Sequence, residues 1–256
     1  MPQILVRIED DVAYVTIANE RKLNTLNRAL MEEFVAAIDG LRGNESLRAV
    51  VLTGAGDRAF VGGADIDEMA QLDSATARDF ITRLHRCCEV LRDLPVPVIA
   101  RIQGYALGGG LELAAACDLR IAAEGAVFGM PEVKLGIPSV IEAALLPPLV
   151  GWGRAREILL LGENFSAAEA AKWGFVESVT PKDELDGGVA RWIESIRGAG
   201  PRAVRLQKKL IRAWEDLPLS QAIAVGIDSF EDAWKSDEPR NLMRRFRAGS
   251  TNPRAR

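Results

Sequence analysis

The 256 residues fit one large domain or two small ones, and 48% of them are hydrophobic and 27% charged, an ordinary composition for a folded protein. The formal net charge of −4 is opposite in sign to the surface that nucleic-acid binding needs, so we expect no nucleic-acid partner. No stretch reaches the roughly 18 uninterrupted apolar residues of a membrane span, and the N-terminus lacks a signal-peptide pattern. We therefore expect no membrane partner and a cytoplasmic location. Three cysteines, Cys87, Cys88 and Cys117, cannot all pair, which favours structural thiols in a reducing compartment.

The first half of the chain alternates between strand and helix signals. Short β-branched runs at residues 4–8 and 12–17 predict a hairpin, and Asn27 can cap a helix over residues 28–42. A loop with one helical turn is expected at 57–72, before a helix over 75–94 that ends ahead of two prolines. The pattern predicts further strands at 49–53, 97–102, 118–122 and 126–129, and a glycine-rich turn at 104–110 leading into a helix at 111–116.

From residue 141 the pattern becomes mostly helical, with one more strand expected at 175–179. The predicted helices cover residues 141–149, 155–161, 167–173, 183–198, 201–215, 219–234 and 238–247. We therefore predict an α/β core over residues 1–195 and a helical region over 196–256. The end of the chain, from Ser250 to Arg256, is expected to be frayed or to depend on a partner.

Several common catalytic signatures are weak or missing. Residues 54–59 match the loose dinucleotide pattern G-x-G-x-x-A, but the residues that follow are a poor helix start. His85 is the single histidine, and no G-x-S-x-G elbow accompanies it, so we favour a helix-surface or interface histidine over a triad member. Catalytic proton transfer would then rest on carboxylates, tyrosine, lysine or water.

Two glycine-rich turns, at residues 59–66 and 104–114, are the strongest functional candidates. Glycines let backbone N–H groups face a cavity, and a helix that starts directly after such a turn adds its positive dipole end. Two such turns facing one point would form an oxyanion hole with two donors. The alternative is that the glycines permit tight turns or close packing.

Two glutamates follow these turns in apolar surroundings. Glu112 lies in the first turn of a helix among leucines and alanines, and Glu132 follows Met130-Pro131 at another turn. A carboxylate in such a stretch faces solvent, pairs with an arginine or serves chemistry. Two carboxylates sharing one water in a dry pocket would have separated pKa values, which suits acid/base work on a carbon acid.

Four segments, in order along nearly the whole chain, resemble the crotonase superfamily, the enoyl-CoA hydratase/isomerase family. They are the asparagine-rich turn at 19–27, the first glycine-rich turn at 59–69, the second at 104–118 and the loop at 128–136. The resemblance implies an α/β fold of the crotonase type, a spiral of ββα units followed by a C-terminal helical oligomerisation region. It also implies a homotrimer or a dimer of trimers.

The resemblance also assigns roles to individual residues. The amides of Ala64 and Gly109 match the positions that hold the thioester oxygen, and Glu112 and Glu132 match the two catalytic glutamates of the hydratases. The implied reaction adds water across the 2,3-double bond of a 2-enoyl-CoA thioester without a metal or redox cofactor. The implied substrate-binding residues are Lys22, Leu23, Ala64, Asp65, Ile66, Gly108, Gly109 and Ser139, and Arg21 and Arg58 are further candidates for the coenzyme A phosphates.

The chain departs from the family pattern after the second glutamate. A glycine-rich run is expected there, but bulkier residues replace the glycines, and Glu142 adds a third carboxylate. Glu142 is either part of a reshaped acyl pocket or an extra acid/base group, or else an exposed or arginine-paired residue. Alternatives to the hydratase function are an enoyl-CoA isomerase, a thioester hydrolase and a non-catalytic acyl-CoA-binding protein. The retained pair of glutamates favours hydration.

Overall fold

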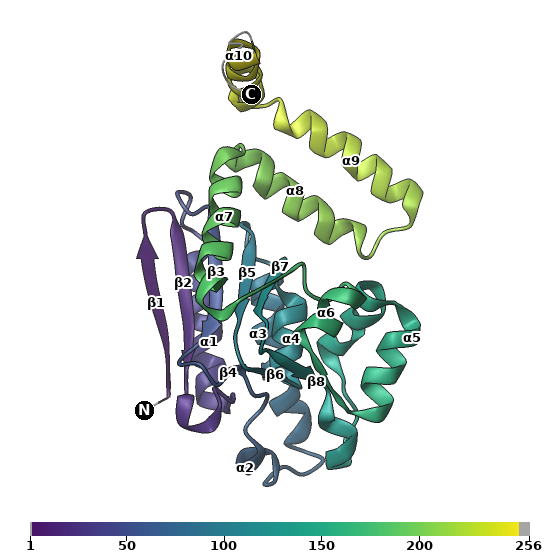
Figure 1. The fold of residues 1–256 in the computed structure, drawn as a ribbon. Helices are drawn as coiled ribbons and strands as arrows, with labels where there is room; N and C mark the ends of the chain where they lie inside the picture. Colours follow the sequence, from purple (N-terminus) through teal and green to yellow (C-terminus); the bar gives the residue numbers. More distant parts are fainter. Residues whose placement is uncertain (1, 251–256) are drawn as a thin grey trace. The chain divides into compact units, whose positions relative to one another are not determined.

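The fold is described for residues 2–250 of a computed structural model. The chain divides into two compact units, one that ends at Trp192 and one that begins at Ile193 (Figure 1). The expectation that the chain end is frayed or partner-dependent concerns residues that, beyond Ser250, lie outside the described part.

Two sheets organise the first unit. Within residues 2–250, six strands form one sheet in the order β1 (Gln3–Glu9), β2 (Val12–Ala18), β3 (Ala49–Gly54), β5 (Val98–Ile102), β7 (Leu119–Ala123) and β10 (Ser178–Thr180). Its strands run parallel except for the antiparallel pair β1 and β2, which confirms the predicted hairpin. The second sheet has the order β4 (Ala59–Val61), β6 (Tyr105–Leu107), β8 (Val127–Gly129) and β9 (Asn164–Ser166).

From β3 to β8, successive strands alternate between the two sheets. β3, β5 and β7 of the large sheet are each followed by β4, β6 and β8 of the small one, and then by helical structure. Figure 1 shows the long strands side by side, with the short strands below them in this view. β4, β6 and β8 are parallel neighbours, so the loops that leave them emerge at the same edge of the small sheet. The candidate site lies at this edge.

Helices cover the strands and bury the remaining apolar residues. The helical elements of the first unit are η1 (Glu20–Lys22), α1 (Arg28–Leu41), α2 (Ile66–Met69), α3 (Ala77–Arg92), α4 (Gly109–Ala116), η2 (Pro131–Leu135), η3 (Ile141–Leu145), α5 (Leu146–Leu161), α6 (Ala167–Trp173) and η4 (Lys182–Glu184), and α7 (Leu185–Gly198) runs into the second unit. Asn27 caps α1 by accepting a hydrogen bond from the Leu30 amide at 2.9 Å, as predicted. Every residue of α4 is buried, and Glu112 is its one charged side chain. Such a helix is held by packing on all sides.

The structure corrects several predicted elements. β4 lies within residues predicted to form a loop, β6 within the predicted glycine-rich turn, and β9 was not predicted. Each has three residues, too few to show an alternating pattern. Residues predicted as a helix at 141–149 begin as the 3-10 turn η3, and α5 continues through residue 161 with Gly151 in a non-helical conformation. The strand expected at 175–179 is shorter and later, at β10.

The three cysteines are buried thiols, as expected for a structural role. Among the described residues, no helix combines the length and the apolar character needed to cross a bilayer.

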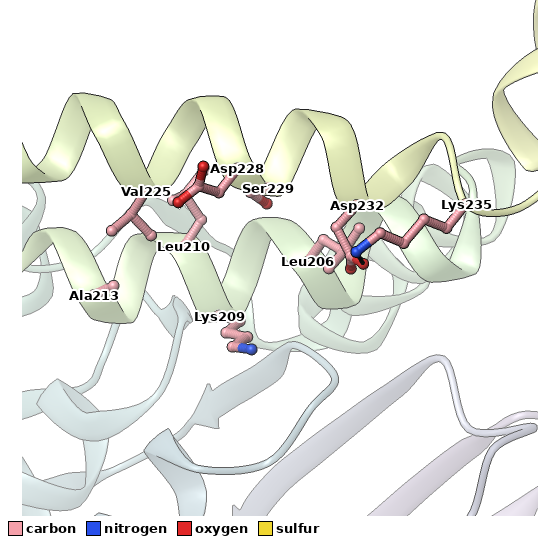
Figure 2. A pocket seen from close by; sticks show the side chains of 9 residues that line it. All are labelled: Leu206, Lys209, Leu210, Ala213, Val225, Asp228, Ser229, Asp232 and Lys235. Atoms are coloured by element: carbon pink, nitrogen blue, oxygen red, sulfur yellow. Dashed lines mark ion pairs between the residues drawn. The ribbon is translucent and has the colours of Figure 1, made fainter.

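The second unit consists of helices. α8 (Pro201–Trp214) and α9 (Leu219–Ala233) lie side by side, and α10 (Glu238–Ser250) follows (Figure 1). The Trp214 indole donates a hydrogen bond to the Ala222 carbonyl at 2.9 Å, which ties the end of α8 to α9. A cavity of about 290 Å³ lies between these helices, and Figure 2 shows the side chains that line it. Among them, Asp232 and Lys235 form an ion pair at 3.2 Å. The lining contains none of the predicted site residues.

Candidate active site

The first glycine-rich turn connects β4 to α2. Leu26 pairs with Ala64 in a parallel bridge: the Leu26 amide donates to the Gly63 carbonyl at 2.9 Å, and the Asp65 amide donates to the Leu26 carbonyl at 2.8 Å. This pairing uses the groups on both sides of Ala64 but not its own N–H. Among the described residues, the Ala64 amide has no backbone acceptor. It is therefore available to a ligand.

The second glycine-rich turn connects β6 to α4. Gly108 has φ 52° and ψ −122°, a conformation that requires glycine, and its amide donates to the Gly129 carbonyl at 2.8 Å. Gly109 is the first residue of α4, so its N–H has no partner within the helix. This N–H lies at the N-terminus of α4, where the helix dipole favours negative charge.

The two turns lie close together. A Cβ atom placed on Gly63 would lie 3.0 Å from the Leu107 carbonyl oxygen and 3.9 Å from the Gly109 nitrogen. The parallel pairing of β4 with β6 produces this approach, because both strands end at the same edge. Gly110 packs so closely on the Val61 carbonyl that a side chain there would collide with it. These glycines therefore permit close backbone packing as well as exposing amides.

Glu112 lies in the first turn of α4 and is 3% exposed. Its Oε1 accepts a hydrogen bond from the Ala143 amide of η3 at 3.0 Å. The pKa of Glu112 is raised to about 8, mainly by burial and in part by the negative charges of Glu132 and Glu142, while the Ala143 hydrogen bond acts in the opposite direction. Glu112 is therefore protonated in the free protein at neutral pH.

Glu132 lies in η2, on the other side of the second turn. Its Oε2 accepts a hydrogen bond from the Ser139 hydroxyl at 2.8 Å, and its Oε1 occupies the space that a side chain on Gly108 would fill. Glu132 is half-buried, whereas Glu112 is fully enclosed. The two carboxyl groups thus differ in environment, which is the arrangement that separates an acid from a base.

Glu142 is neither exposed nor paired with an arginine, so that sequence-based alternative is wrong. It is 7% exposed in η3, and its Oε1 lies 2.9 Å from the Nδ1 of His85 on α3. The bulky residues that replace the family's glycines build η3, which brings Glu142 under α3. His85 is partly buried as a consequence, and it has a defined partner. The residues next to His85 and Glu142 in the sequence do not predict this pairing, because the two are far apart in the chain.

The asparagine-rich turn lies against the first glycine-rich turn. Asn24 is buried and donates to the carbonyls of Ala55 and Ala59 at 2.9 and 2.8 Å. The carbonyl of Leu23 accepts from the Gly62 amide at 2.8 Å. The sequence indicates that this segment belongs to the site. It does not indicate that Asn24 anchors the segment through these two hydrogen bonds.

Lys22 reaches from this turn to the start of α2. Its Nζ lies 2.8 Å from Asp65 Oδ2 and 2.8 Å from Asp67 Oδ2, and these hydrogen bonds raise the pKa of Lys22. Burial alone would raise the pKa of Asp65, but hydrogen bonds from Lys22 and from the Glu68 amide outweigh burial and lower it. Ile66 is 60% exposed at the same edge.

The predicted residues therefore gather at one edge, at the ends of β4 and β6. Ala64, Gly108, Gly109, Glu112, Glu132 and Ser139 form its centre, and Lys22, Leu23, Asp65 and Ile66 belong to the adjoining turns. Arg21 and Arg58 are exposed. Within residues 2–250, no group of three or more His, Cys, Asp or Glu side chains is arranged to hold a metal ion.

Comparison with known proteins agrees with this architecture. The family model described as enoyl-CoA hydratase/isomerase matches residues 7–248. The chain is 35% identical over 244 residues to the short-chain-enoyl-CoA hydratase of Clostridium acetobutylicum, covering 95% of this chain and 94% of that protein. It is 34% identical to the crotonyl-CoA hydratase of Syntrophomonas wolfei over the same shares of the two chains.

The crystal structure of an enoyl-CoA hydratase from Bacillus anthracis superimposes with a TM-score of 0.93 at 35% identity, covering 96% of each chain. The predicted fold class, repeated ββα units followed by C-terminal helices, is confirmed. The chain belongs to the enoyl-CoA hydratase/isomerase family.

Proposed function

We propose that this protein is an enoyl-CoA hydratase that adds water across the 2,3-double bond of a 2-enoyl-CoA thioester. The observation that carries the proposal is the pair of glutamates at the second glycine-rich turn. Glu112 lies in the helix that the turn begins, and Glu132 places its Oε1 over Gly108. The names of the family relatives support the same reaction.

In the proposed reaction the amides of Ala64 and Gly109 donate hydrogen bonds to the thioester oxygen. Charge develops on this oxygen as water adds to C3, and one such donor typically contributes about 3 kcal/mol to the transition state. The buried turn supports this role, because water competes poorly with fixed amides in a site of low polarity.

The two glutamates would hold the attacking water between them. Glu132 takes a proton from the water as its oxygen bonds to C3, and then gives a proton to C2 of the resulting enolate. Glu112, protonated at neutral pH, orients the water by hydrogen bonding. General acid–base assistance of this kind contributes about 10²–10⁴-fold. The reaction as written requires no group beyond the coenzyme A of the substrate, so we expect treatment with EDTA to leave the rate unchanged.

Substrate contacts around this centre are part of the proposal. The adjoining turns with Lys22, Leu23, Asp65 and Ile66 would carry the coenzyme A portion, and Ser139 would lie beside the acyl portion. Lys22 is about half exposed but held by two carboxylates, so an exposed Arg21 or Arg58 is the freer partner for a phosphate.

We also propose that the second unit supports self-association into a trimer or a dimer of trimers. α9 carries an exposed apolar row at helical spacing, Leu219, Ile223, Ile227 and Phe230, with exposures from 57% to 78%. A soluble helix that exposes such a row normally buries it against a partner.

The test follows the absorbance of the conjugated thioester with crotonyl-CoA, and identifies products by mass. We expect loss of absorbance, the gain of one water, and a rate at least 100-fold lower for Glu132→Gln. Glu163→Gln is the matched control, because Glu163 is an exposed carboxylate that pairs with Lys134 of η2 at 2.6 Å. If the protein instead moves the double bond of a 3-enoyl thioester without adding water, it is an isomerase. If it releases the free thiol of coenzyme A, it is a thioester hydrolase.

A further inference from the structure

Glu142 is a buried charged group that the proposed reaction does not use. Its side chain is 8% exposed, and its Oε1 lies 2.9 Å from His85 Nδ1. Its Oε2 is buried, and the Cys88 thiol offers this carboxylate only a weak hydrogen bond. Removing a carboxylate from water is unfavourable unless its oxygens are satisfied, so a half-satisfied carboxylate here calls for a role.

The neighbours of Glu142 in η3 connect it to the reaction centre. Ala143, the next residue, donates its amide to Glu112 Oε1 at 3.0 Å. Ile141, the preceding residue, has φ 42°, a left-handed conformation that a β-branched side chain rarely adopts. Such a backbone persists only where surrounding contacts enforce it. The His85–Glu142 contact joins η3 to α3 at this strained point.

The groups around Glu142 define its electrostatic environment. α3 contributes His85 and the buried thiols of Cys87 and Cys88, and α4 contributes Glu112. α5 also packs on η3, and its first titratable residue is Arg154, well beyond the turn. The pKa of Glu112 is raised first by burial and also by the charges of Glu132 and Glu142. Negative charge on Glu142 thus acts directly on the hydration site.

We propose that His85 and Glu142 are a positioning pair for the hydration reaction, holding η3 so that the Ala143 amide fixes Glu112. This inference rests on the proposed hydratase function. The Oε1 of Glu142 is taken by His85, and the link from the pair to the reaction centre runs through the Ala143 amide. The pair acts through Glu112.

The first experiment measures kcat/KM for crotonyl-CoA against pH. Glu142→Gln keeps the size of the side chain and can still accept a hydrogen bond from His85, but it lacks the charge. We expect the decline in rate above about pH 8, where Glu112 loses its proton, to move about one pH unit lower. Glu89→Gln on α3 is the matched control; its carboxylate pairs with exposed Arg86, and we expect the wild-type profile.

The second experiment tests the geometric part at His85, whose side chain is 44% exposed and whose replacement should leave the fold intact. His85→Ala removes the donor, and we expect kcat to fall about 10- to 100-fold with little change in KM, as for a slightly misplaced catalytic group. His85→Asn places an amide N–H near the position of Nδ1, and we expect it to restore kcat to within about threefold of wild type, because the donor returns. Melting temperatures identify any unfolded variant.

The outcomes separate two failures. If the wild type adds water to no 2-enoyl thioester, the proposed function fails and the role of the pair with it. If the wild type hydrates crotonyl-CoA but Glu142→Gln keeps its pH profile, only the role of the pair is overturned. Equal losses in His85→Asn and His85→Ala would overturn it as well, because then the hydrogen bond would not matter.

Discussion

Replacing Glu112 by glutamine should make the protein more stable than the wild type, by a margin that grows as the pH rises. The replacement should also lower the activity. The pKa of this carboxyl is about 8 in the folded protein against 4.5 when exposed. Between these values the folded state holds a proton that the unfolded chain has lost, so wild-type stability falls as pH rises through this window. At about 1.4 kcal/mol for each pH unit, the loss is about 3 kcal/mol at pH 7 and about 5 kcal/mol above pH 8. The glutamine variant lacks this loss.

The assay is urea unfolding of wild type and Glu112→Gln at matched protein concentration, from pH 5 to pH 9. All other titratable groups are common to both proteins, so the difference in unfolding free energy isolates Glu112. We expect this difference to grow in favour of the variant up to about pH 8 and then to level off. A constant offset between the two proteins across the range would refute the raised pKa and the protonated role of Glu112. Such an offset would come only from the hydrogen bonds of the new amide, which do not depend on pH.

Three further predictions concern other parts of the chain. Gly108→Ala puts a side chain where Glu132 Oε1 lies and at a φ of 52°, so we expect crotonyl-CoA hydration to fall about 100-fold in a stopped-flow assay while the melting temperature stays measurable. Arg120→Met leaves the Glu177 carboxylate and several backbone carbonyls without their buried guanidinium, and urea unfolding should show a loss of about 3 kcal/mol; no loss would mean that these contacts are replaced by water. Ile227→Glu places a charge in the exposed apolar row of α9, and light scattering should report a smaller oligomer than wild type, with an unchanged mass arguing against this interface.

The candidate site was predictable to the extent that local sequence determines local backbone. The glycines at 108–110 dictate a tight turn before a helix, and the apolar run around Glu112 dictates that this helix is buried. Both properties depend on neighbours along the chain. The resemblance to a family then assigned roles to Ala64, Gly109, Glu112 and Glu132.

The strands that carry these turns were harder to predict. β4, β6 and β9 are too short for a periodic signal, and pairing with partners distant in the sequence forms them. η3 was expected to be part of a helix, because its composition suits one. Packing against α3 and α4 instead holds it as a 3-10 turn with Ile141 in a left-handed conformation.

By itself the sequence determined most of the longer helices and strands, the buried helix with its glutamate and the amides that a glycine turn leaves without a side chain in the way, since each depends on residues within one or two turns of the chain. The tertiary structure alone decided which of these groups meet. It brings Gly63 to Gly109, the Ala143 amide to Glu112, and His85 to Glu142. Ala143 and Glu112 are 31 positions apart in the sequence, and His85 and Glu142 are 57 apart. No local pattern encodes the packing of distant strands and helices that brings such residues together.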